Sequence, residues 1–200
     1  MKVLVIGASG LLGGAAAAAL RDDGCEVLRA SRSSDLTVDV TDPDSVRRLF
    51  ETVGIVDAVV VAVGSVPFKP LAELSREDFV SGFYGKVQAQ VDVVQIGMPY
   101  VTDGGSFTLT TGILAREAVR TGAAAALANG ALESFVLAAA AEAPRGIRIN
   151  TVSPTVLVEA TSHHAAFPGF AQVTAERVGQ GYLKAVRGVQ SGQVLIPERP

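Results

Sequence analysis

Near its start the chain reads Val3-Leu4-Val5-Ile6-Gly7-Ala8-Ser9-Gly10-Leu11-Leu12-Gly13-Gly14, and this stretch decides its fold. A β-branched run leads into a Gly-x-x-Gly-x-x-Gly turn and then an alanine-rich helix, the order of a dinucleotide-binding βαβ unit. Gly7 permits the tight turn, Gly10 lets backbone approach a pyrophosphate, and Gly13 lets helix and sheet pack closely. The amides that open the helix would then face phosphate. Because such a pattern alone is weak, a turn without a ligand is the alternative.

Strand-like and helix-like segments alternate along the rest of the chain. We expect strands at 2–6, 26–30, 36–40, 56–63, 106–111, 147–152 and 193–196, and helices at 11–22, 44–53, 79–98, 121–143 and 174–186. Asp42-Pro43 and the Ser75/Asp78 pair are typical helix starts. The alternation predicts an α/β fold: a Rossmann-type doubly wound parallel sheet of about seven strands, in a single three-layer domain. Residues 153–170 form the one long irregular stretch, and such loops often cover sites.

Composition narrows the class of protein. Of 200 residues, 48% are hydrophobic and only 6% aromatic, so we expect a core of Val, Leu, Ile and Ala between strands and helices. A net charge of −3 gives no electrostatic case for nucleic acid. The single Cys25 excludes an internal disulfide and supports no metal cluster. We see no apolar run of about 18 residues, and therefore expect a cytoplasmic protein without a membrane span.

Four further segments accompany the glycine turn. They are Asp39-Val40-Thr41-Asp42 after the third strand, residues 59–64, residues 146–154 (Gly-Ile-Arg-Ile-Asn-Thr-Val-Ser-Pro) and residues 191–196. In this order and spacing, over essentially the whole chain, they resemble the short-chain dehydrogenase/reductase superfamily. The resemblance implies that the acidic motif contacts adenine and that the segment ending at Pro154 runs into the nicotinamide pocket.

The catalytic set of that superfamily does not carry over. The family uses a Ser after the fifth strand and a Tyr-x-x-x-Lys pair on the next long helix. Alignment places Gly112 at the Ser position, Ala125 at the Tyr position and Asn129 at the Lys position. Lys86 falls where the family has a helix Asn, and Gly64 alone survives of its Asn-Asn-Ala-Gly turn. The chain therefore resembles a short, divergent branch that keeps the cofactor half and lacks the usual acid.

The end of the second strand bears on the choice of cofactor. NAD is usually read there by an acid, but residues 29–34 hold Ser31, Arg32 and Ser33 and no acid. A guanidinium and hydroxyls suit a 2′-phosphate, so we predict NADP; a solvated Arg32 is the alternative. The full set of predicted cofactor-binding residues is Gly7, Ser9, Gly10, Leu11, Leu12, Gly13, Ser31, Arg32, Ser33, Asp39, Val40, Ala62, Val63, Gly64 and Pro154.

Lys86 is the first candidate for chemistry. It interrupts an apolar helix face, and burial would lower its pKa toward neutrality. It could hold the ribose in place of the missing Lys or donate a proton, or its ammonium could reach solvent from a packed stem. Tyr84, two residues away, faces elsewhere on the helix and is expected to pack.

Further candidates for the chemistry lie on three other segments. Thr111 could hydrogen-bond a substrate carbonyl or be an ordinary strand residue, and Thr110 should face the other side of the sheet. Asn129 cannot titrate but could bind a ribose hydroxyl. His163 and His164 lie in the irregular stretch and are expected to be surface residues without a metal.

These observations favour an NADP(H)-dependent oxidoreductase acting on a small carbonyl or alcohol by hydride transfer, with a non-standard proton donor. An inactive NADP-binding sensor or scaffold is the alternative, since fold alone does not establish activity. Residues 64–69 and 154–170 would line an apolar pocket for a small molecule. The apolar helix around residues 123–128, together with the resemblance, implies a homodimer or homotetramer.

Overall fold

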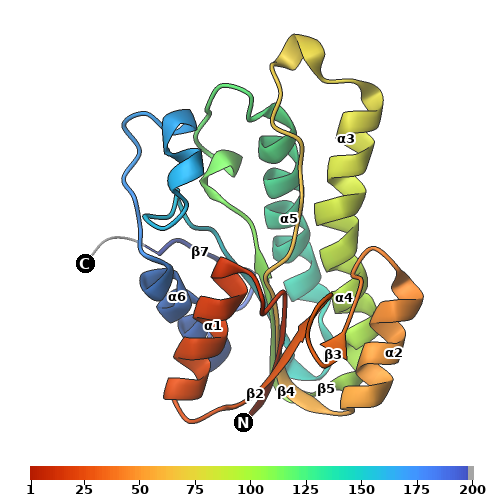
Figure 1. Ribbon diagram of the computed structural model, residues 1–200. Coiled ribbons are helices and arrows are strands. Elements are labelled where there is room, and N and C mark those ends of the chain that lie inside the picture. The colour runs from red at the N-terminus through yellow and green to blue at the C-terminus, as the bar shows by residue number, and fades with distance from the viewer. Residues whose placement is uncertain (198–200) are drawn as a thin grey trace.

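The computed structural model describes residues 1–197. Its core is one seven-stranded parallel sheet of order β3-β2-β1-β4-β5-β6-β7, which confirms the expected α/β fold (Figure 1). The strands are β1 (Lys2–Ile6), β2 (Glu26–Ser31), β3 (Leu36–Thr37), β4 (Val56–Val61), β5 (Val101–Thr110), β6 (Arg148–Val152) and β7 (Val194–Leu195). The strand order reverses direction between β1 and β4, and ligands of such sheets bind at the carboxyl edge beside this point.

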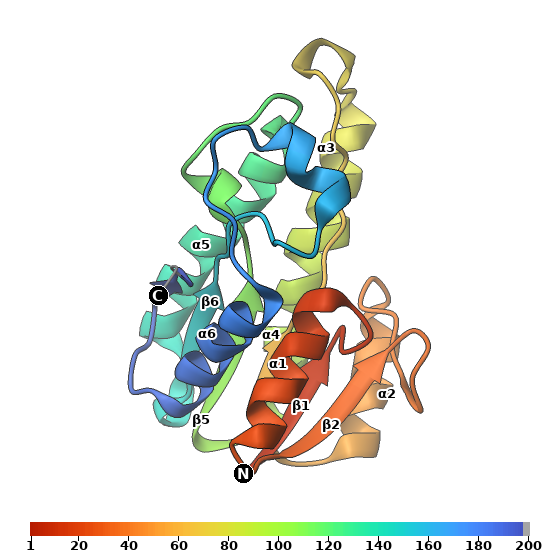
Figure 2. The same cartoon turned by 60° about the vertical axis from the view of Figure 1, so that its left-hand side comes forward.

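Helices cover both faces of the sheet. Figure 2 shows α1 (Leu11–Asp22) and α6 (Ala175–Arg187) side by side in front of one face. The other face carries α2 (Pro43–Val53), α4 (Ala89–Gly97) and α5 (Ala123–Glu142). Each interlayer space holds its own buried cluster of aliphatic side chains, because strands covered on both sides are apolar on both sides.

Shorter helical segments sit mainly at the carboxyl edge of the sheet. They are α3 (Arg76–Gly82), η1 (Leu71–Glu73), η3 (Met98–Tyr100), η4 (Ile113–Ala115), η5 (Pro144–Gly146) and η6 (Thr161–Ala166), the last within the stretch expected to be irregular. Between α3 and α4 runs a π-helical segment, η2 (Phe83–Gln88), so the predicted single helix 79–98 is three consecutive segments. Isolated π turns often mark functional sites.

Strand boundaries differ from the predictions by more than one residue in three strands. β5 begins at Val101 rather than at 106 because Val101 already pairs with Val56, and the register then shifts. Gly104, within the added part of the strand, has a positive φ of 72°. β3 ends at Thr37 and β4 at Val61, earlier than expected, because the following backbone turns into the carboxyl-edge loops.

The expectation that no segment could span a membrane requires a correction. Helix α5 is long and apolar enough to cross a bilayer by length and composition, with a mean hydropathy of 1.5. The core helix of a soluble protein passes the same test, and α5 packs one side on the sheet through Leu132 and Val136. Glu133, in its middle, is engaged in an ion pair.

Candidate functional site

A cleft of about 670 Å³ lies at the carboxyl edge of β1, β2 and β4. It brings together eleven of the fifteen predicted cofactor residues: Gly7, Ser9, Gly10, Ser31, Arg32, Ser33, Asp39, Val40, Ala62, Val63 and Gly64. Ser65 and Gly85 complete its far wall, where the Ser65 amide donates to the Gly85 carbonyl at 3.3 Å. These segments lie far apart in sequence, and only the parallel sheet aligns their ends.

The three glycines of the opening turn have different reasons to be glycine. Gly7 has a φ of 87°, and a Cβ there would lie 2.3 Å from the Ala62 carbonyl oxygen. A Cβ on Gly13 would lie 2.1 Å from the Gly7 oxygen. Gly10 has an ordinary φ of −82°, and its Cβ would meet only the Gly7 oxygen, at 3.4 Å. The fold therefore requires Gly7 and Gly13, whereas at Gly10 the missing side chain leaves an open cradle beside the start of α1.

Four predicted cofactor residues do not line this cleft. The amides of Leu11, Leu12 and Gly13 belong to the first turn of α1 and have no acceptor within the helix. The Leu11 side chain instead borders a groove between α1 and α6, and Leu12 packs into the core beneath. Pro154 is buried, and its carbonyl accepts from the Ile113 amide at 2.9 Å.

The end of β2 presents hydroxyls and one guanidinium to the cleft. Ser31 is buried, and its Oγ lies 2.8 Å from Ser34 Oγ and accepts from the Ser33 amide at 3.2 Å. Arg32 and Ser33 are exposed on the cleft wall. The structure thus places the three residues predicted to meet a 2′-phosphate together at one end.

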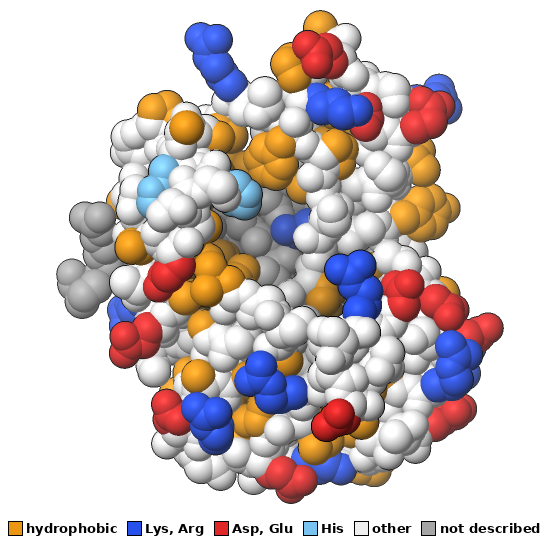
Figure 3. Space-filling view, in the orientation of Figure 1, with side chains coloured by type: hydrophobic (Ala, Val, Ile, Leu, Met, Phe, Trp, Pro, Cys, Tyr) orange, Lys and Arg blue, Asp and Glu red, His pale blue; other side chains and the backbone are white. Residues whose placement is uncertain are grey.

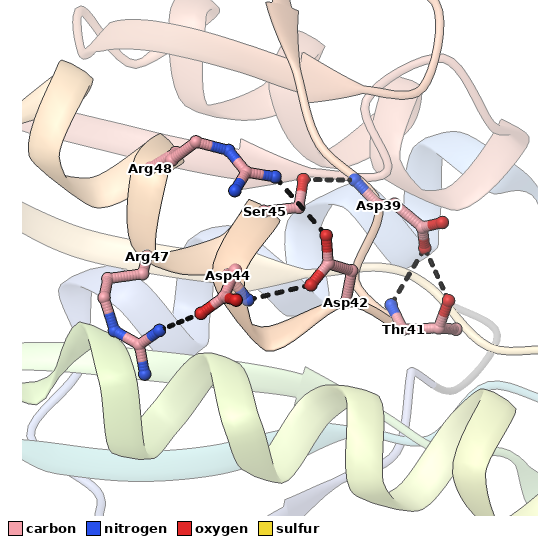
Figure 4. Close-up of polar contacts among 7 residues, drawn as sticks. All are labelled: Asp39, Thr41, Asp42, Asp44, Ser45, Arg47 and Arg48. Carbon is pink, nitrogen blue, oxygen red and sulfur yellow. Dashed lines mark hydrogen bonds and ion pairs between the residues drawn. The ribbon is translucent and has the colours of Figure 1, made fainter.

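Asp39 is partly engaged by its own turn (Figure 4). Its Oδ1 accepts from the Thr41 amide at 2.9 Å and from Thr41 Oγ1 at 2.7 Å, while its amide donates to Ser45 Oγ. These hydrogen bonds, with a smaller contribution from Arg32, lower the pKa of Asp39. Asp39 therefore stays ionised in the cleft wall.

The neighbouring helix start follows the prediction from sequence. Asp42 caps α2 by accepting from the Asp44 amide at 2.9 Å and pairs with Arg48, while Arg47 pairs with Asp44 (Figure 4). Pro43 occupies the first turn, where a missing amide hydrogen costs nothing. The cap fixes where the loop carrying Asp39 and Val40 joins the helix.

Lys86 belongs to the π-helical segment η2, and its stem reaches Gly64 of the cleft. A Cβ on Gly64, which has a φ of 147°, would lie 2.7 Å from Lys86 Cγ and 2.9 Å from Cδ, so the lysine stem packs directly on the glycine. The side chain is half-buried, and burial lowers the pKa of Lys86 to about 8. The expected direction of that shift is confirmed. Among residues 1–197 no hydrogen bond or ion pair engages the ammonium.

Thr111 does not face the cleft as a donor, which argues against its predicted contact with a substrate carbonyl. Its Oγ1 donates to Glu133 Oε1 at 3.1 Å and accepts from Thr151 Oγ1 at 3.3 Å. Arg116 binds both oxygens of Glu133 at 2.6 Å and reaches Ser153 Oγ at 2.7 Å. The hydroxyl is thus held within a closed polar network at the ends of β5 and β6.

Sequence reasoning missed this network. Glu133 follows Asn129 by one helical turn and Ala125 by two, so all three share a face of α5. An acid on the inner face of an otherwise apolar helix was the available signal. Nothing in the sequence singled out Arg116 as its partner, 17 residues away.

Asn129 fills the space left by the small residue at position 112. A Cβ on Gly112 would lie 3.4 Å from Asn129 Nδ2, and the Asn129 side chain is buried, with a residue exposure of 4%. Its Oδ1 is buried and accepts no hydrogen bond from residues 1–197. Ala125 is buried beside it and offers no polar atom. A buried oxygen without a donor is unfavourable, because no hydrogen bond offsets its desolvation.

Gln90 is a second residue that sequence reasoning missed. It is fully buried, and its Nε2 donates to the carbonyls of Val63 and Thr110 at 3.1 and 2.9 Å. Its Oε1 accepts from the Thr110 amide at 2.9 Å. The amide therefore joins the ends of β4 and β5 where they diverge, and positions Gly64 relative to Thr111.

Contacts on the two faces of β5 match one prediction. Thr110 Oγ1 donates to the Val61 carbonyl and lies 2.7 Å from the hydroxyl of Tyr182 in α6, so it faces away from Thr111. Burial raises the pKa of Tyr182 above its ordinary value, despite the Thr110 hydrogen bond. Tyr182 is therefore a neutral core residue.

Other residues singled out in the sequence lie outside the site chemistry. The prediction that Tyr84 has a packing role is wrong: 61% of it is exposed, and its ring lies edge-on to that of Phe83. His163 is exposed, and His164 Nε2 lies 2.9 Å from the Leu157 carbonyl. Within residues 1–197 no group of three His, Cys, Asp or Glu residues could hold a metal ion.

Above the sheet the molecular surface is hollowed. Figure 3 shows this hollow with hydrophobic side chains along its walls, His side chains on its rim and Lys or Arg atoms inside. The ribbon view places residues 64–75 and α3 on one side of it, and residues 153–172 with η6 on the other (Figure 1). The arrangement suits a small, partly apolar ligand next to the cleft.

Comparison with known proteins identifies relatives over nearly the whole chain. The family described as enoyl-(acyl carrier protein) reductase matches residues 7–189. The crystal structure of lin1944 from Listeria innocua is 46% identical, with a TM-score of 0.96 over 99% of this chain and 100% of that one. A small-chain dehydrogenase crystallised with NADPH is 25% identical, with a TM-score of 0.86 over 98% and 95% of the two chains.

A curated protein also matches most of this chain. The hydroxynaphthalene reductase-like protein Arp2 of Metarhizium brunneum is 28% identical over 178 residues, which cover 84% of this chain. The match spans 66% of that protein, slightly less than two thirds of its length.

Proposed function

The chain belongs to the short-chain dehydrogenase/reductase superfamily, and from this premise we propose that it is an NADP(H)-dependent oxidoreductase of small carbonyl compounds or alcohols. The observation that carries the proposal is the cleft at the carboxyl edge of β1, β2 and β4, which brings the Gly7–Gly10 turn together with Ser31, Arg32, Ser33 and Asp39. The relative crystallised with NADPH supports the same choice of cofactor.

The residues present fit a dinucleotide. The amides of Leu11, Leu12 and Gly13, together with the dipole of α1, would hold the pyrophosphate over Gly10. Arg32, with Ser31 and Ser33, would bind the 2′-phosphate. The remaining predicted residues would border the two halves of the dinucleotide. Those beside the adenosine half would be Asp39, Val40, Ala62 and Val63, and those beside the other half Ser9, Gly64 and Pro154.

The nicotinamide half would meet residues unlike the usual catalytic set. The bound cofactor would supply the hydride that converts a carbonyl to an alcohol. Asn129 Oδ1 would accept from a ribose hydroxyl, in place of the missing lysine. The proton that completes the alcohol would come from the ammonium of Lys86 or from water, since Ala125 and Gly112 carry no acid.

A sensor or scaffold that binds NADP without turnover is the second candidate. The closed Thr111–Glu133–Arg116 network favours it, because this network occupies the ends of β5 and β6 without offering a proton to the cleft. Mixing the protein with NADPH and a panel of aldehydes and ketones separates the two. Loss of reduced-cofactor absorbance supports the enzyme, and tight binding without turnover supports the sensor.

The preference for NADP is tested at Arg32. A charge-assisted hydrogen bond contributes about 1.5–3 kcal/mol, so Arg32→Ala should weaken NADPH binding roughly ten- to hundredfold and leave NADH unchanged. Arg47→Ala, an exposed arginine paired with Asp44, removes the same charge from α2 and is the matched control. Fluorescence titration of both nucleotides measures it; equal weakening of NADPH and NADH would contradict the proposal.

We also propose a homodimer or homotetramer through α5. Leu127 and Leu137 are 54% and 67% exposed on that helix, and Val80, Phe83 and Tyr84 are exposed on the neighbouring α3 and η2. Apolar side chains gathered on adjacent helices mark a surface that a second copy could cover.

A further inference from the structure

Lys86 packs its stem on the cleft residue Gly64, and no acid among residues 1–197 is paired with its ammonium. The adjacent residues Ser65 and Gly85 also line the cleft. Burial lowers the pKa of Lys86. A partly desolvated ammonium without a partner is unfavourable, unless a ligand brings the missing anion.

Three acids on the elements around the hollow are already engaged. Glu133 of α5 is held by Arg116, and Asp78 of α3 pairs with Lys69 at 2.8 Å. Both carboxylate oxygens of Glu159, in the segment opposite, accept from the Ala175 amide at 3.0 Å. We therefore expect a ligand to supply the counter-ion of the Lys86 ammonium.

The proposed cofactor does not supply that anion. Its pyrophosphate would lie at the start of α1 and its 2′-phosphate at Arg32, both on the β1–β2 side of the cleft. Lys86 rises from η2 on the opposite wall, next to the segment that follows β4. The substrate is therefore the ligand that would pair with Lys86.

We infer that the substrate is a carbonyl compound that carries a carboxylate, and that Lys86 pairs with this carboxylate. The inference rests on the proposed function and gives Lys86 a binding role, so the proton would come from water. Val66 and Pro67 are half-buried and Phe68 is exposed on the segment after Gly64, and they would contact the carbon chain of the substrate. The carboxylate is unchanged by the reaction.

The test compares charged and neutral substrates of the same shape. The probes are 2-oxobutanoate and 4-oxopentanoate, each beside its amide, with NADPH and the full-length protein. Lys86→Met keeps the length of the stem and removes the charge, Lys86→Arg keeps the charge, and Lys184→Met removes an exposed lysine from α6 as the matched control. We expect Lys86→Met to raise KM for the oxo acids about tenfold or more, with KM for the amides nearly unchanged.

Other outcomes overturn the inference. A fall in kcat for acids and amides alike in Lys86→Met would make Lys86 the proton donor. Equal KM values for acid and amide in the unaltered protein would show that no cationic side chain binds the carboxylate of the substrate.

A binding measurement covers the case without turnover. Calorimetric titration of 4-oxopentanoate, with and without NADP⁺, should show binding that Lys86→Met abolishes and Lys86→Arg retains. If NADPH binds and the oxo acid does not, the inference fails and the choice of cofactor stands. If the oxo acid binds through Lys86 but neither NADPH nor NADH binds, the proposed function fails and the anion site remains.

Discussion

Gly10 and Gly13 show how the same residue can serve the fold or a ligand. At Gly13 the neighbouring backbone of Gly7 leaves no room for a Cβ, so the close approach of helix and sheet demands glycine. At Gly10 the protein itself makes no such demand. The glycine pattern was visible in the sequence, but only the packed structure separates the two roles.

Alanine at each position should separate them in solution. Gly13→Ala forces backbone apart and should lower the free energy of unfolding by about 1–3 kcal/mol or more. Gly10→Ala should leave stability within about 0.5 kcal/mol of the parent yet weaken NADPH at least about tenfold, because the methyl group enters the phosphate cradle. Denaturant unfolding and fluorescence titration measure the pair; unchanged NADPH affinity in Gly10→Ala would remove the cradle from the argument.

Lys86 makes stability depend on pH in a specific window. Its pKa falls from an ordinary 10.5 to about 8 on folding, so the folded protein binds fewer protons than the unfolded chain between these values. Stability should therefore rise with pH across that window. The charged groups on adjoining elements, Arg116 with Glu133 and Lys69 with Asp78, form neutral pairs and do not reverse the sign.

Removing the charge should stabilise the protein when no ligand is bound. Lys86→Met should raise the free energy of unfolding at pH 7 by about 1–3 kcal/mol and flatten its rise between pH 8 and 10.5. Urea unfolding at several pH values measures this, with Lys184→Met as the comparison. A destabilised Lys86→Met at pH 7 would show that the ammonium has a partner in the folded protein.

At the scale of elements, polar side chains join the ends of β4, β5 and β6 to the helices that carry the site. Gln90 of α4 connects β4 with β5, and the network around Glu133 connects β5, β6 and α5 through the loop that holds Arg116. Strand ends diverge at the carboxyl edge, where backbone ladders stop. Beyond the last backbone hydrogen bonds between the strands, these side chains hold the strand ends together and set the spacing between Lys86, Gly64 and Asn129.

The ion pair between Arg116 and Glu133 predicts different stabilities for a single and a double variant. Glu133→Ala leaves the Arg116 guanidinium unpaired against half-buried surroundings and should cost about 2–4 kcal/mol of stability. The double variant Arg116→Met/Glu133→Leu should recover much of the loss, because no unpaired charge remains. Thermal unfolding of the two variants measures the difference. Equal losses would mean that the pair acts only through packing.

At the scale of the whole molecule, α5 divides its surface between two environments. Its inner face closes the core through Leu132 and Val136 and carries Asn129 to the site, while Leu127 and Leu137 lie outside. A helix that is apolar on both faces needs a second covering surface. We assign that surface to another copy of the chain.

Charge on the outer face should therefore disperse the assembly. Leu127→Glu/Leu137→Glu should convert an oligomer to monomers with little change in NADPH affinity, since neither residue borders the cleft. Val189→Glu, at a residue 90% exposed after α6, is the matched control and should leave the mass unchanged. Light scattering after size-exclusion chromatography measures both. A monomeric parent would overturn the assignment.

Local pattern determined much of this protein. The glycine turn, the alternation of strands and helices and the caps at Asp42 and Ser75 are short-range signals, and the sheet aligned the predicted cofactor residues accordingly. Such features depend on backbone conformation within a few residues, which sequence reports directly.

Only the tertiary structure decided which side chains meet. Thr111 donates to Glu133, and Gln90 connects two strands. Asn129 lies beside Gly112 with an oxygen that accepts no hydrogen bond from residues 1–197, and the stem of Lys86 packs on Gly64. These contacts link residues on different elements, up to 40 positions apart in the network that holds Thr111. They depend on how helices cross the sheet, a geometry set by the packing of the whole core rather than by any local stretch.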